Sequence, residues 1–312
     1  MTLDPNKTAF LFPGQGSQAV GMGRELAGAH PAAAAVYEQA DELLGFRLSR
    51  LAWEGPEDEL NDTINTQPAL LVHSTAALFV LTEKLPGLKP RFVAGHSLGQ
   101  LSALVAAGAL DYPAALALTR RRGELMKAAG ERHPGGMAAV LGLEIPAVEA
   151  LCAEASNGDE RVQVANDNCP GQVVVSGAGP ALERLGPLAE AAGARKFVPL
   201  AVSIAAHSYL MEHARADFNT AVDAAGLADP AVPVVGNVEA APLSTAAAIE
   251  ADLKAQLTSR VRWTESIAFM IAAGVDTFVE IGTGEVLSAL VRRIDRGASR
   301  ITIGGPDDLT KV

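Results

Sequence analysis

Short apolar runs alternate with helix-like patterns along most of the chain, which predicts an α/β fold. Apolar runs bounded by polar residues predict buried strands at 8–12, 91–94, 232–235 and 277–281. Apolar positions at helical spacing predict helices at 31–44, 67–84, 100–107, 113–130, 245–257 and 263–273, and another that begins at Glu285. Helices packed against a largely parallel sheet suit such a sequence.

The segment 133–200 has a complete pattern of its own. It predicts strands at 137–141, 161–165, 172–176 and 195–198, with helices at 145–156 and 180–192. This β-α-β-β-α-β order is typical of a ferredoxin-like unit. We therefore expect residues 133–200 to form a small domain inserted into a large one, which comprises residues 1–132 and 201–312. A boundary between two such domains is a common place for a ligand cleft.

Composition narrows the possible partners and compartments. Of the 312 residues, 49% are hydrophobic but only 4% aromatic, so the core is expected to consist mainly of Ala, Val and Leu. The net charge of −11 argues against nucleic acid or an anionic membrane as the main partner. The N-terminus lacks a signal-peptide pattern, and no apolar segment is expected to span a bilayer. We expect a cytoplasmic, monomeric protein that does not bind a membrane.

Metal and disulfide chemistry is not expected. The two cysteines, Cys152 and Cys169, are too few and too unpatterned for a disulfide framework or a zinc site. An acidic partner would have to dock on a local basic patch, and two clusters are candidates. They comprise Arg120, Arg121, Lys127 and Arg132, and Arg260, Arg262, Arg292 and Arg293. For any single residue of these clusters, the favoured interpretation is a solvated helix face.

The sequence Gly95-His96-Ser97-Leu98-Gly99 lies between the predicted strand at 91–94 and the predicted helix at 100–107. In that context a G-x-S-x-G sequence forms a nucleophile elbow, a sharp turn that exposes the serine hydroxyl. The glycines permit the tight turn, and the helix that follows directs N–H groups toward any oxyanion formed there. We therefore predict that Ser97 is a nucleophile.

A serine nucleophile needs a base, and the chain has six histidines. His207 follows a run of small apolar residues in a loop after the inserted segment, so it could face the elbow across the cleft. The remaining histidines are His30, His73, His96, His133 and His213, and the sequence alone leaves the choice between His207 and these five open.

Arg122 lies in the middle of the apolar face of the predicted helix 113–130. A charge in that position needs an anion, because an unpaired buried charge costs several kcal/mol. The anion is either an internal Asp or Glu or the carboxylate of a substrate. The pattern does not decide between these two interpretations.

The glycine-rich turn Gly14-Gln15-Gly16-Ser17-Gln18-Ala19 follows the first predicted strand. It matches a dinucleotide-binding fingerprint only weakly, because Pro13 interrupts the turn and no acidic strand end follows at the required distance. We instead expect the backbone amides of Gln15 and Leu98 to form an oxyanion hole beside Ser97.

These motifs together resemble the malonyl-CoA:acyl-carrier-protein transacylases. The resemblance extends in order over nearly the whole chain, through Phe10-Leu11-Phe12-Pro13-Gly14-Gln15-Gly16-Ser17-Gln18, Gly95-His96-Ser97-Leu98-Gly99, Arg122-Gly123, Asn166-Asp167-Asn168, Ala206-His207-Ser208, Gln256-Leu257 and Glu280-Ile281-Gly282. It implies an α/β-hydrolase-like core with an inserted ferredoxin-like subdomain. It also implies transfer of a malonyl group from malonyl-CoA to the phosphopantetheine thiol of acyl carrier protein in fatty acid synthesis. No bound cofactor or metal is implied, and the acidic carrier would dock on a basic patch.

The resemblance also implies roles for single residues. Ser97 would be the nucleophile and His207 its base, oriented by the backbone carbonyl of Gln256. Arg122 would pair with the malonyl carboxylate, and Asn166 would lie near the acyl pocket. The resemblance likewise places the oxyanion at the Gln15 and Leu98 amides.

Two departures from the family pattern concern the same region. Gln100 stands where the family usually has Glu, so any role of that carboxylate is expected to be lost. Ala206 stands where the family often has Ser or Phe, which could relax discrimination against α-branched acyl groups. Three alternatives stay open: a transferase for a polyketide or branched extender unit, a serine esterase or thioesterase, and a non-catalytic module that docks carrier proteins.

Overall fold

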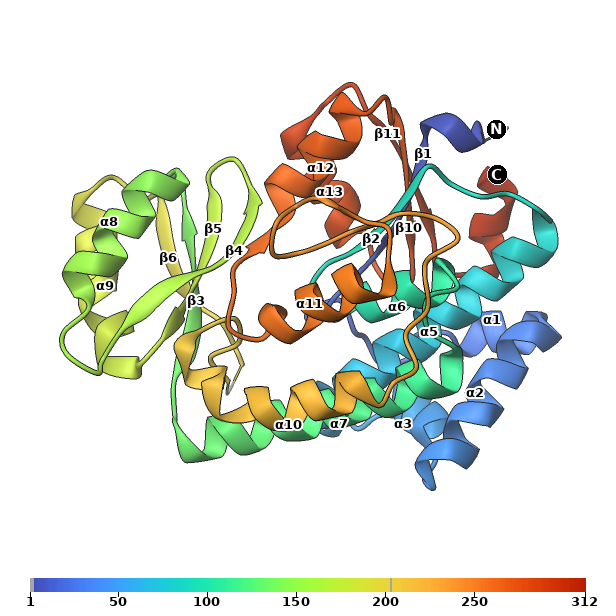
Figure 1. Cartoon of the computed structure of the whole chain (residues 1–312), viewed down its shortest axis with the longest axis horizontal. Helices are drawn as coiled ribbons and strands as arrows, with labels where there is room; N and C mark the ends of the chain where they lie inside the picture. The colour runs from blue at the N-terminus through green and yellow to red at the C-terminus, as the bar shows by residue number, and fades with distance from the viewer. Residues whose placement is uncertain (1–2, 203) are drawn as a thin grey trace.

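The computed structural model describes residues 3–202 and 204–312, which form a large lobe and a small lobe (Figure 1). Within these residues the large lobe contains a sheet with the strand order β11-β10-β1-β2-β7-β8. All neighbouring strands are parallel except β7 and β8, so the sheet is mixed at one edge. The bounds of these strands are β1 Thr8–Phe12, β2 Phe92–Gly95, β7 Val234–Val235, β8 Pro242–Leu243, β10 Thr277–Ile281 and β11 Ser299–Ile303.

Helices cover both faces of this sheet. Successive side chains of a strand point to opposite faces, and because both sets are apolar, both faces need to be covered. Ala9 and Leu11 pack in one apolar cluster with residues of α12 and α13, whereas Phe10 and Phe12 pack in another with residues of α2, α5, α6 and α7. The helices of the large lobe are α1 Arg24–Ala29, α2 Pro31–Leu44, α3 Leu48–Glu54, α4 Glu57–Asn61, α5 Thr63–Lys84, α6 Gly99–Ala106, α7 Tyr112–Arg132, α10 Glu212–Asp223, α11 Ala246–Gln256, α12 Trp263–Ala272 and α13 Val286–Ile294. The described residues also include the short 3₁₀ helices η1 Pro5–Lys7, η2 Tyr209–Met211 and η3 Pro306–Lys311.

Helix α5 begins four residues before the predicted start at residue 67. The Asp62 side chain accepts a hydrogen bond from the Ile64 amide and so caps the helix. Pro68 therefore lies inside the helix rather than in its first turn, and it has no N–H for the carbonyl of Ile64. Nη1 of Arg120 donates to that carbonyl at 3.0 Å, so the acceptor left by the proline is satisfied from α7.

The expectation that no segment is long and apolar enough to span a membrane was wrong. Helix α5 is 22 residues long and apolar enough to qualify, but 83% of its most apolar stretch is buried inside the protein. It contacts α2, α6 and α7. Its apolar character is therefore that of a core helix.

The small lobe contains β3 Gly136–Leu141, α8 Ile145–Ala155, β4 Val162–Cys169, β5 Gln172–Gly177, α9 Gly179–Ala191 and β6 Lys196–Pro199, in the predicted order. Its sheet has the strand order β6-β3-β5-β4-β9, and the first four strands are antiparallel to their neighbours. Strand β9 (Val261–Arg262) comes from the later part of the chain and pairs with β4 in parallel. A separate apolar cluster fills the space between this sheet and helices α8 and α9.

Several further elements differ from the sequence prediction, which did not include α1, α3, α4, β8 or β9. Strand β4 continues through Asn166 and Asp167, beyond the predicted end at residue 165, because two register shifts accommodate these residues and β9 pairs beside them. Helix α10 was missed, although Ala214, Phe218 and Val222 recur at helical spacing and are buried. Strand β11 was also missed.

Candidate active site

Ser97 lies in the sharp turn between β2 and α6, with a left-handed backbone conformation (φ 52°). The two flanking positions have no room for a side chain. A Cβ atom at Gly95 would lie 1.9 Å from the carbonyl carbon of Gly99, and one at Gly99 would lie 2.1 Å from the carbonyl oxygen of Phe12. The Ser97 amide donates to Oδ1 of Asn237 at 2.7 Å, which fixes the turn from the far side. The structure therefore has the strand, turn and helix expected of a nucleophile elbow.

His207 is the histidine that contacts this serine. Its Nε2 lies 2.7 Å from Ser97 Oγ, and its Nδ1 lies 2.9 Å from the backbone carbonyl oxygen of Gln256. Because a carbonyl only accepts, Nδ1 carries the proton and Nε2 is free to accept the serine proton. Burial, followed by the positive charge of Arg122, lowers the pKa of His207 to about 3. The imidazole is consequently neutral at physiological pH and can act as a base.

The other histidines lie in other surroundings. His73 is buried in α5, where burial lowers its pKa to about 4. His96 contacts the Oδ1 of Asn168 at 2.8 Å, and His133 stacks on His213. None of these is within hydrogen-bond distance of the Ser97 hydroxyl among the described residues, so the geometry singles out His207.

Arg122 lies on α7 and is 2% exposed. Its Nη2 donates to Ser97 Oγ at 3.2 Å and to Oε1 of Gln256 at 3.0 Å, and its Nη1 donates to Oε1 of Gln67 at 2.7 Å. Within residues 3–202 and 204–312 it forms no ion pair, so the internal salt bridge considered above is not observed. Burial lowers the pKa of Arg122 to about 10, which leaves it charged at neutral pH. A buried cation beside a serine hydroxyl has the chemistry to bind an anionic group.

Gln15, Leu98 and Asn166 line the same cavity as Ser97, His207 and Arg122. The cavity has a volume of about 110 Å³. The backbone amides of Gln15 and Leu98 form no hydrogen bond in the described part of the chain, and Leu98 caps the N-terminus of α6. The two amides are thus available to an oxyanion. The remaining lining residues are His96, Met126, Met137, Leu200, Val202, Ile204 and Ala206.

Several polar residues of the site were missed by sequence reasoning. Gln67 accepts from Arg122, and its Nε2 donates to Oγ1 of Thr63 at 2.9 Å. That hydroxyl donates to Oε1 of Gln15 at 3.0 Å, which connects the arginine to the glycine-rich turn. Thr63 and Gln67 stand four residues apart, on one face of a largely apolar helix. This spacing of polar residues was the available signal.

The Gln256 side chain also has a part that the sequence did not indicate. Only its backbone carbonyl was expected to act, yet its Nε2 donates to the Ser97 carbonyl at 3.1 Å and to Oε1 of Gln100 at 2.6 Å. Gln256 therefore contacts the serine, the histidine and Arg122 at once.

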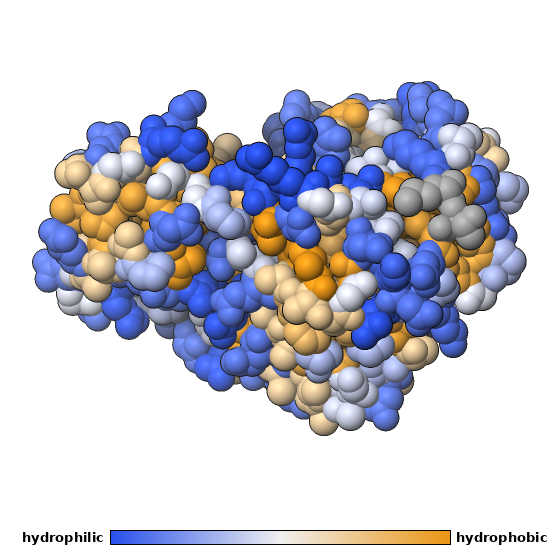
Figure 2. Space-filling view, turned by 90° about the horizontal axis from the view of Figure 1, so that it is seen from above, coloured by the Kyte–Doolittle hydropathy of each residue, from blue (hydrophilic) through white to orange (hydrophobic). Residues whose placement is uncertain are grey.

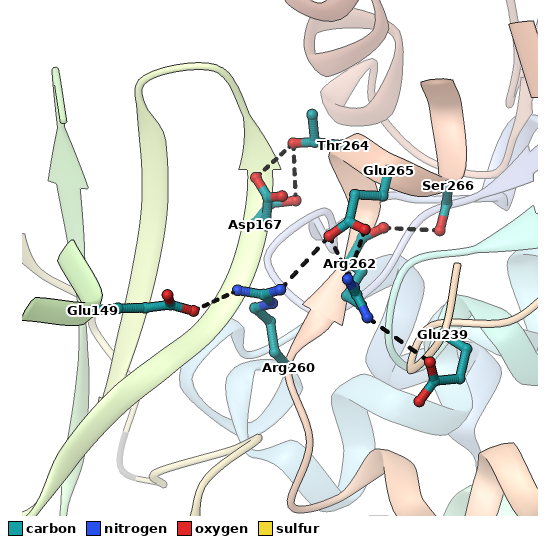
Figure 3. Close-up of polar contacts among 8 residues, drawn as sticks. All are labelled: Glu149, Asp167, Glu239, Arg260, Arg262, Thr264, Glu265 and Ser266. Carbon is teal, nitrogen blue, oxygen red and sulfur yellow. Dashed lines mark hydrogen bonds and ion pairs between the residues drawn. The ribbon is translucent and has the colours of Figure 1, made fainter. Parts of the chain in front are cut away.

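The two basic clusters are largely engaged in ion pairs. Arg260 pairs with Glu149 of the small lobe and with Glu265, and Arg262 pairs with Glu265 and Glu239 (Figure 3). In the other cluster, the ion pairs are Arg120–Glu124, Arg121–Glu124, Arg121–Asp217 and Lys127–Asp62. Arg292 and Arg293 form no ion pair within the described residues. Figure 2 shows hydrophilic side chains beside the hollow between the two lobes.

No group of three or more metal-ligating side chains is found in the described part of the chain. Cys152 and Cys169 are buried and unpaired, and burial raises the pKa of both thiols. Neither cysteine lines the cavity beside Ser97.

Comparisons with known proteins match nearly the full chain to acyl transferases. The acyl transferase domain family matches residues 9–304. The malonyl CoA-acyl carrier protein transacylase of Bacillus subtilis is 45% identical over 304 residues, which are 97% of this chain and 95% of that protein. The transacylase of the same name from Haemophilus influenzae is 43% identical over 92% of each chain.

Solved structures of malonyltransferases also match nearly the whole chain. An acyl carrier protein S-malonyltransferase from Vibrio cholerae superposes with a TM-score of 0.93 and 40% identity, over 98% of this chain and 99% of that one. A malonyl-transacylase structure solved in complex with a type II polyketide synthase acyl-carrier protein superposes with a TM-score of 0.94 and 40% identity, over 98% of each chain.

Proposed function

The chain belongs to the acyl transferase family and transfers malonyl groups from malonyl-CoA to acyl carrier protein, and we propose that it does so through a malonyl ester of Ser97. The observation that carries this proposal is the 3.2 Å contact between the Arg122 guanidinium and the Ser97 hydroxyl inside one cavity. An alcohol and a buried cation at this separation suit an acyl group that bears its own carboxylate.

In the first half-reaction, Ser97 Oγ attacks the thioester carbon of malonyl-CoA while Nε2 of His207 takes the hydroxyl proton. The carbonyl oxygen becomes an oxyanion, which the amides of Gln15 and Leu98 stabilise. The carbon–sulfur bond then breaks, CoA leaves as a thiol with the proton from His207, and malonyl-Ser97 remains. The Gln256 carbonyl stabilises the transient imidazolium by accepting from Nδ1.

In the second half-reaction, the phosphopantetheine thiol of acyl carrier protein takes the place of CoA. His207 accepts the thiol proton, and the sulfur attacks the ester carbon of malonyl-Ser97. The ester bond breaks, and the proton returns to Oγ of the serine. The result is a ping-pong transfer with no change of oxidation state and no bound cofactor.

Arg122 acts on the acyl group rather than on the thioester. A guanidinium pairs with a carboxylate through two parallel hydrogen bonds, which select a dicarboxylic acyl group and hold it in one orientation. Asn166 lines the acyl pocket, and its side chain forms no hydrogen bond in the described part of the chain. The small side chain of Ala206 also lines the pocket, which supports tolerance of an α-branched extender unit as a second candidate activity.

We propose an α/β-hydrolase-like large domain (residues 1–132 and 201–312) and an inserted ferredoxin-like domain (133–200). The separate apolar cluster and the strand order β6-β3-β5-β4 of the small lobe support this division. The cavity is lined from both lobes, so the insertion supplies one wall of the site. We further propose that the protein works as a monomer in the cytoplasm, without a membrane partner.

The acidic carrier protein is proposed to dock near Arg292 and Arg293, in the last turn of α13. Nη1 of Arg293 donates to Oε1 of Gln172, which lies in the β4–β5 hairpin. The same hairpin contains Asn168, which contacts His96 at the cavity, so Arg293 lies near the site. These arginines lack ion-pair partners among the described residues, unlike most of the other basic candidates. Their charge is therefore available to acidic side chains of a partner.

Intact-mass analysis after exposure to malonyl-, methylmalonyl-, acetyl- and succinyl-CoA tests the proposal. We expect a malonyl adduct on Ser97 that disappears when acyl carrier protein is added and reappears on the carrier. Steady hydrolysis that the carrier does not affect would instead identify a thioesterase. No adduct with any thioester would favour a carrier-docking module.

A further inference from the structure

A chain of side-chain hydrogen bonds connects Arg122 to a buried carboxylate that does not touch the cavity. Arg122 Nη2 donates to Oε1 of Gln256, and Nε2 of Gln256 donates to Oε1 of Gln100 at 2.6 Å. Nε2 of Gln100 then donates to Oδ2 of Asp252 at 2.7 Å. Asp252 and Gln256 lie one turn apart on α11, and Gln100 lies in the first turn of α6. All four side chains are buried.

The two ends of this chain have opposite hydrogen-bonding character. An ionised carboxylate only accepts hydrogen bonds, and a guanidinium only donates them. The two carboxamides between them each have one accepting and one donating end, so their orientation has to agree with both ends of the chain. With Asp252 at one end, Gln100 must present its NH₂ to the carboxylate and its carbonyl to Gln256. Gln256 must then present its carbonyl to Arg122.

The other contacts of Asp252 agree with this direction. Its Oδ1 accepts from the Val238 amide at 3.1 Å, and its Oδ2 accepts from the Asn237 amide at 3.4 Å. No cation pairs with it within residues 3–202 and 204–312. Burial raises the pKa of Asp252, whereas the hydrogen bonds from Gln100, Val238 and Asn237 lower it. A buried carboxylate without a cationic partner is costly, which points to a role for Asp252 beyond packing.

We propose that Asp252 is a positioning residue that orients the two carboxamides and thereby holds the Arg122 guanidinium in place for the malonyl carboxylate. Asp252 acts through Gln100 and Gln256 and contacts neither substrate nor nucleophile. Asp252 also places a carboxylate next to Gln100. The sequence analysis expected the role of a carboxylate at position 100 to be lost, because the family usually has Glu there. This inference rests on the proposed function, because the property that it explains is selection of a charged acyl group.

Asp252→Asn preserves shape but replaces one accepting oxygen with an NH₂ group. That group then faces another donor, either Nε2 of Gln100 or the Val238 amide, so residue 252 no longer holds Gln100 firmly in place. We expect the ratio of malonyl to acetyl loading on Ser97 to fall about tenfold, the scale of one charge-assisted hydrogen bond. The matched control is Glu250→Gln on the same helix, which removes an exposed negative charge that pairs with Lys254. The control is expected to keep the wild-type ratio.

The double variant Gln100→Glu with Asp252→Asn returns an accepting carboxylate to the chain, with the two groups exchanged. The carboxylate introduced at position 100 would accept from both position 252 and Gln256, so we expect the ratio to return to near the wild-type value. A merely structural role of Asp252 would not give this rescue. A wild-type ratio in Asp252→Asn, or a double variant that folds without recovering the ratio, would overturn the inference.

If Asp252→Asn does not fold, Gln100→Met breaks the same chain at its middle, and a wild-type ratio in that variant would equally overturn the inference. Wild-type protein that folds but takes up no malonyl group would refute the proposed function instead. The two failures are therefore distinguishable.

Discussion

Replacing Arg122 with alanine tests the link between the buried guanidinium and the choice of acyl group. The malonyl carboxylate would lose a pair of hydrogen bonds to a charged group, each contributing about 1.5–3 kcal/mol. A loss of about 3–6 kcal/mol corresponds to a fall of roughly a hundredfold to ten-thousandfold in kcat/KM for malonyl-CoA. Acetyl-CoA has no carboxylate, so its kcat/KM is expected to change by less than about tenfold.

The same substitution changes the surroundings of the site in two ways. It leaves Oε1 of Gln67 and Oε1 of Gln256 without their donor, which costs about 1–3 kcal/mol of folding stability for each buried acceptor. It also removes the second largest cause of the low pKa of His207, so that pKa rises toward its ordinary value. A more basic imidazole does not impair proton removal, and this is a further reason for acetyl loading to persist.

The assay is rapid-quench loading of Ser97 with malonyl-CoA and acetyl-CoA in parallel, followed by intact-mass analysis. Arg121→Ala is the matched control, because Arg121 is adjacent to Arg122 in α7 but is exposed and pairs with the surface residues Glu124 and Asp217. Thermal melting of both variants separates loss of folded protein from loss of selectivity. Equal losses for the two thioesters in folded Arg122→Ala would refute the role of Arg122 as the carboxylate-binding residue.

Four further outcomes are expected. Ser97→Ala removes the malonyl adduct, and an adduct detected on another residue would reject the assignment of the nucleophile. Because the pKa of His207 is about 3, the loading rate should show no acid limb between about pH 5 and about pH 8, whereas a midpoint near 6.5 would contradict the burial argument. The unfolded chain binds a proton at His73 near pH 6.5 and the folded chain only near pH 4, so stability falls by roughly 3 kcal/mol as the pH drops through this window. His73→Gln should reduce that loss in urea titrations at neutral and acid pH, while His30→Gln should not. Gly99→Ala should yield little soluble protein, since its Cβ would overlap backbone atoms, and a normal melting temperature would disprove this.

The large-scale organisation was predictable because it depends on local patterns. Strands β1, β2 and β10 and helices α2 and α7 occur within a few residues of the expected positions, since their apolar periodicity is strong and their ends carry turn or cap residues. The order of elements in the small lobe followed from the same signals. The sequence also indicated that Ser97 lies in a glycine-flanked turn and that Arg122 lies on the buried face of its helix, and the structure has both in those places.

The rest depends on contacts between distant segments, which one sequence does not reveal. Asn237 reaches the Ser97 amide across 140 residues, and Gln67 reaches Arg122 across 55. The sequence suggested that the site lacks a carboxylate at Gln100, because Asp252, which contacts Gln100, lies far along the chain. The pairing of β9 with β4 was likewise out of reach, because two residues are too few to give a strand pattern.

The left-handed backbone at the serine has a counterpart in the histidine, which has φ 58°. For residues other than glycine this conformation costs roughly 1–2 kcal/mol each, out of a net stability of about 5–15 kcal/mol for a typical domain. Glycine would relieve the backbone at either position and would abolish the chemistry. Laboratory evolution that screens for heat tolerance alone would therefore favour inert molecules, and hardier variants of this catalyst should be sought with both of these residues kept unchanged.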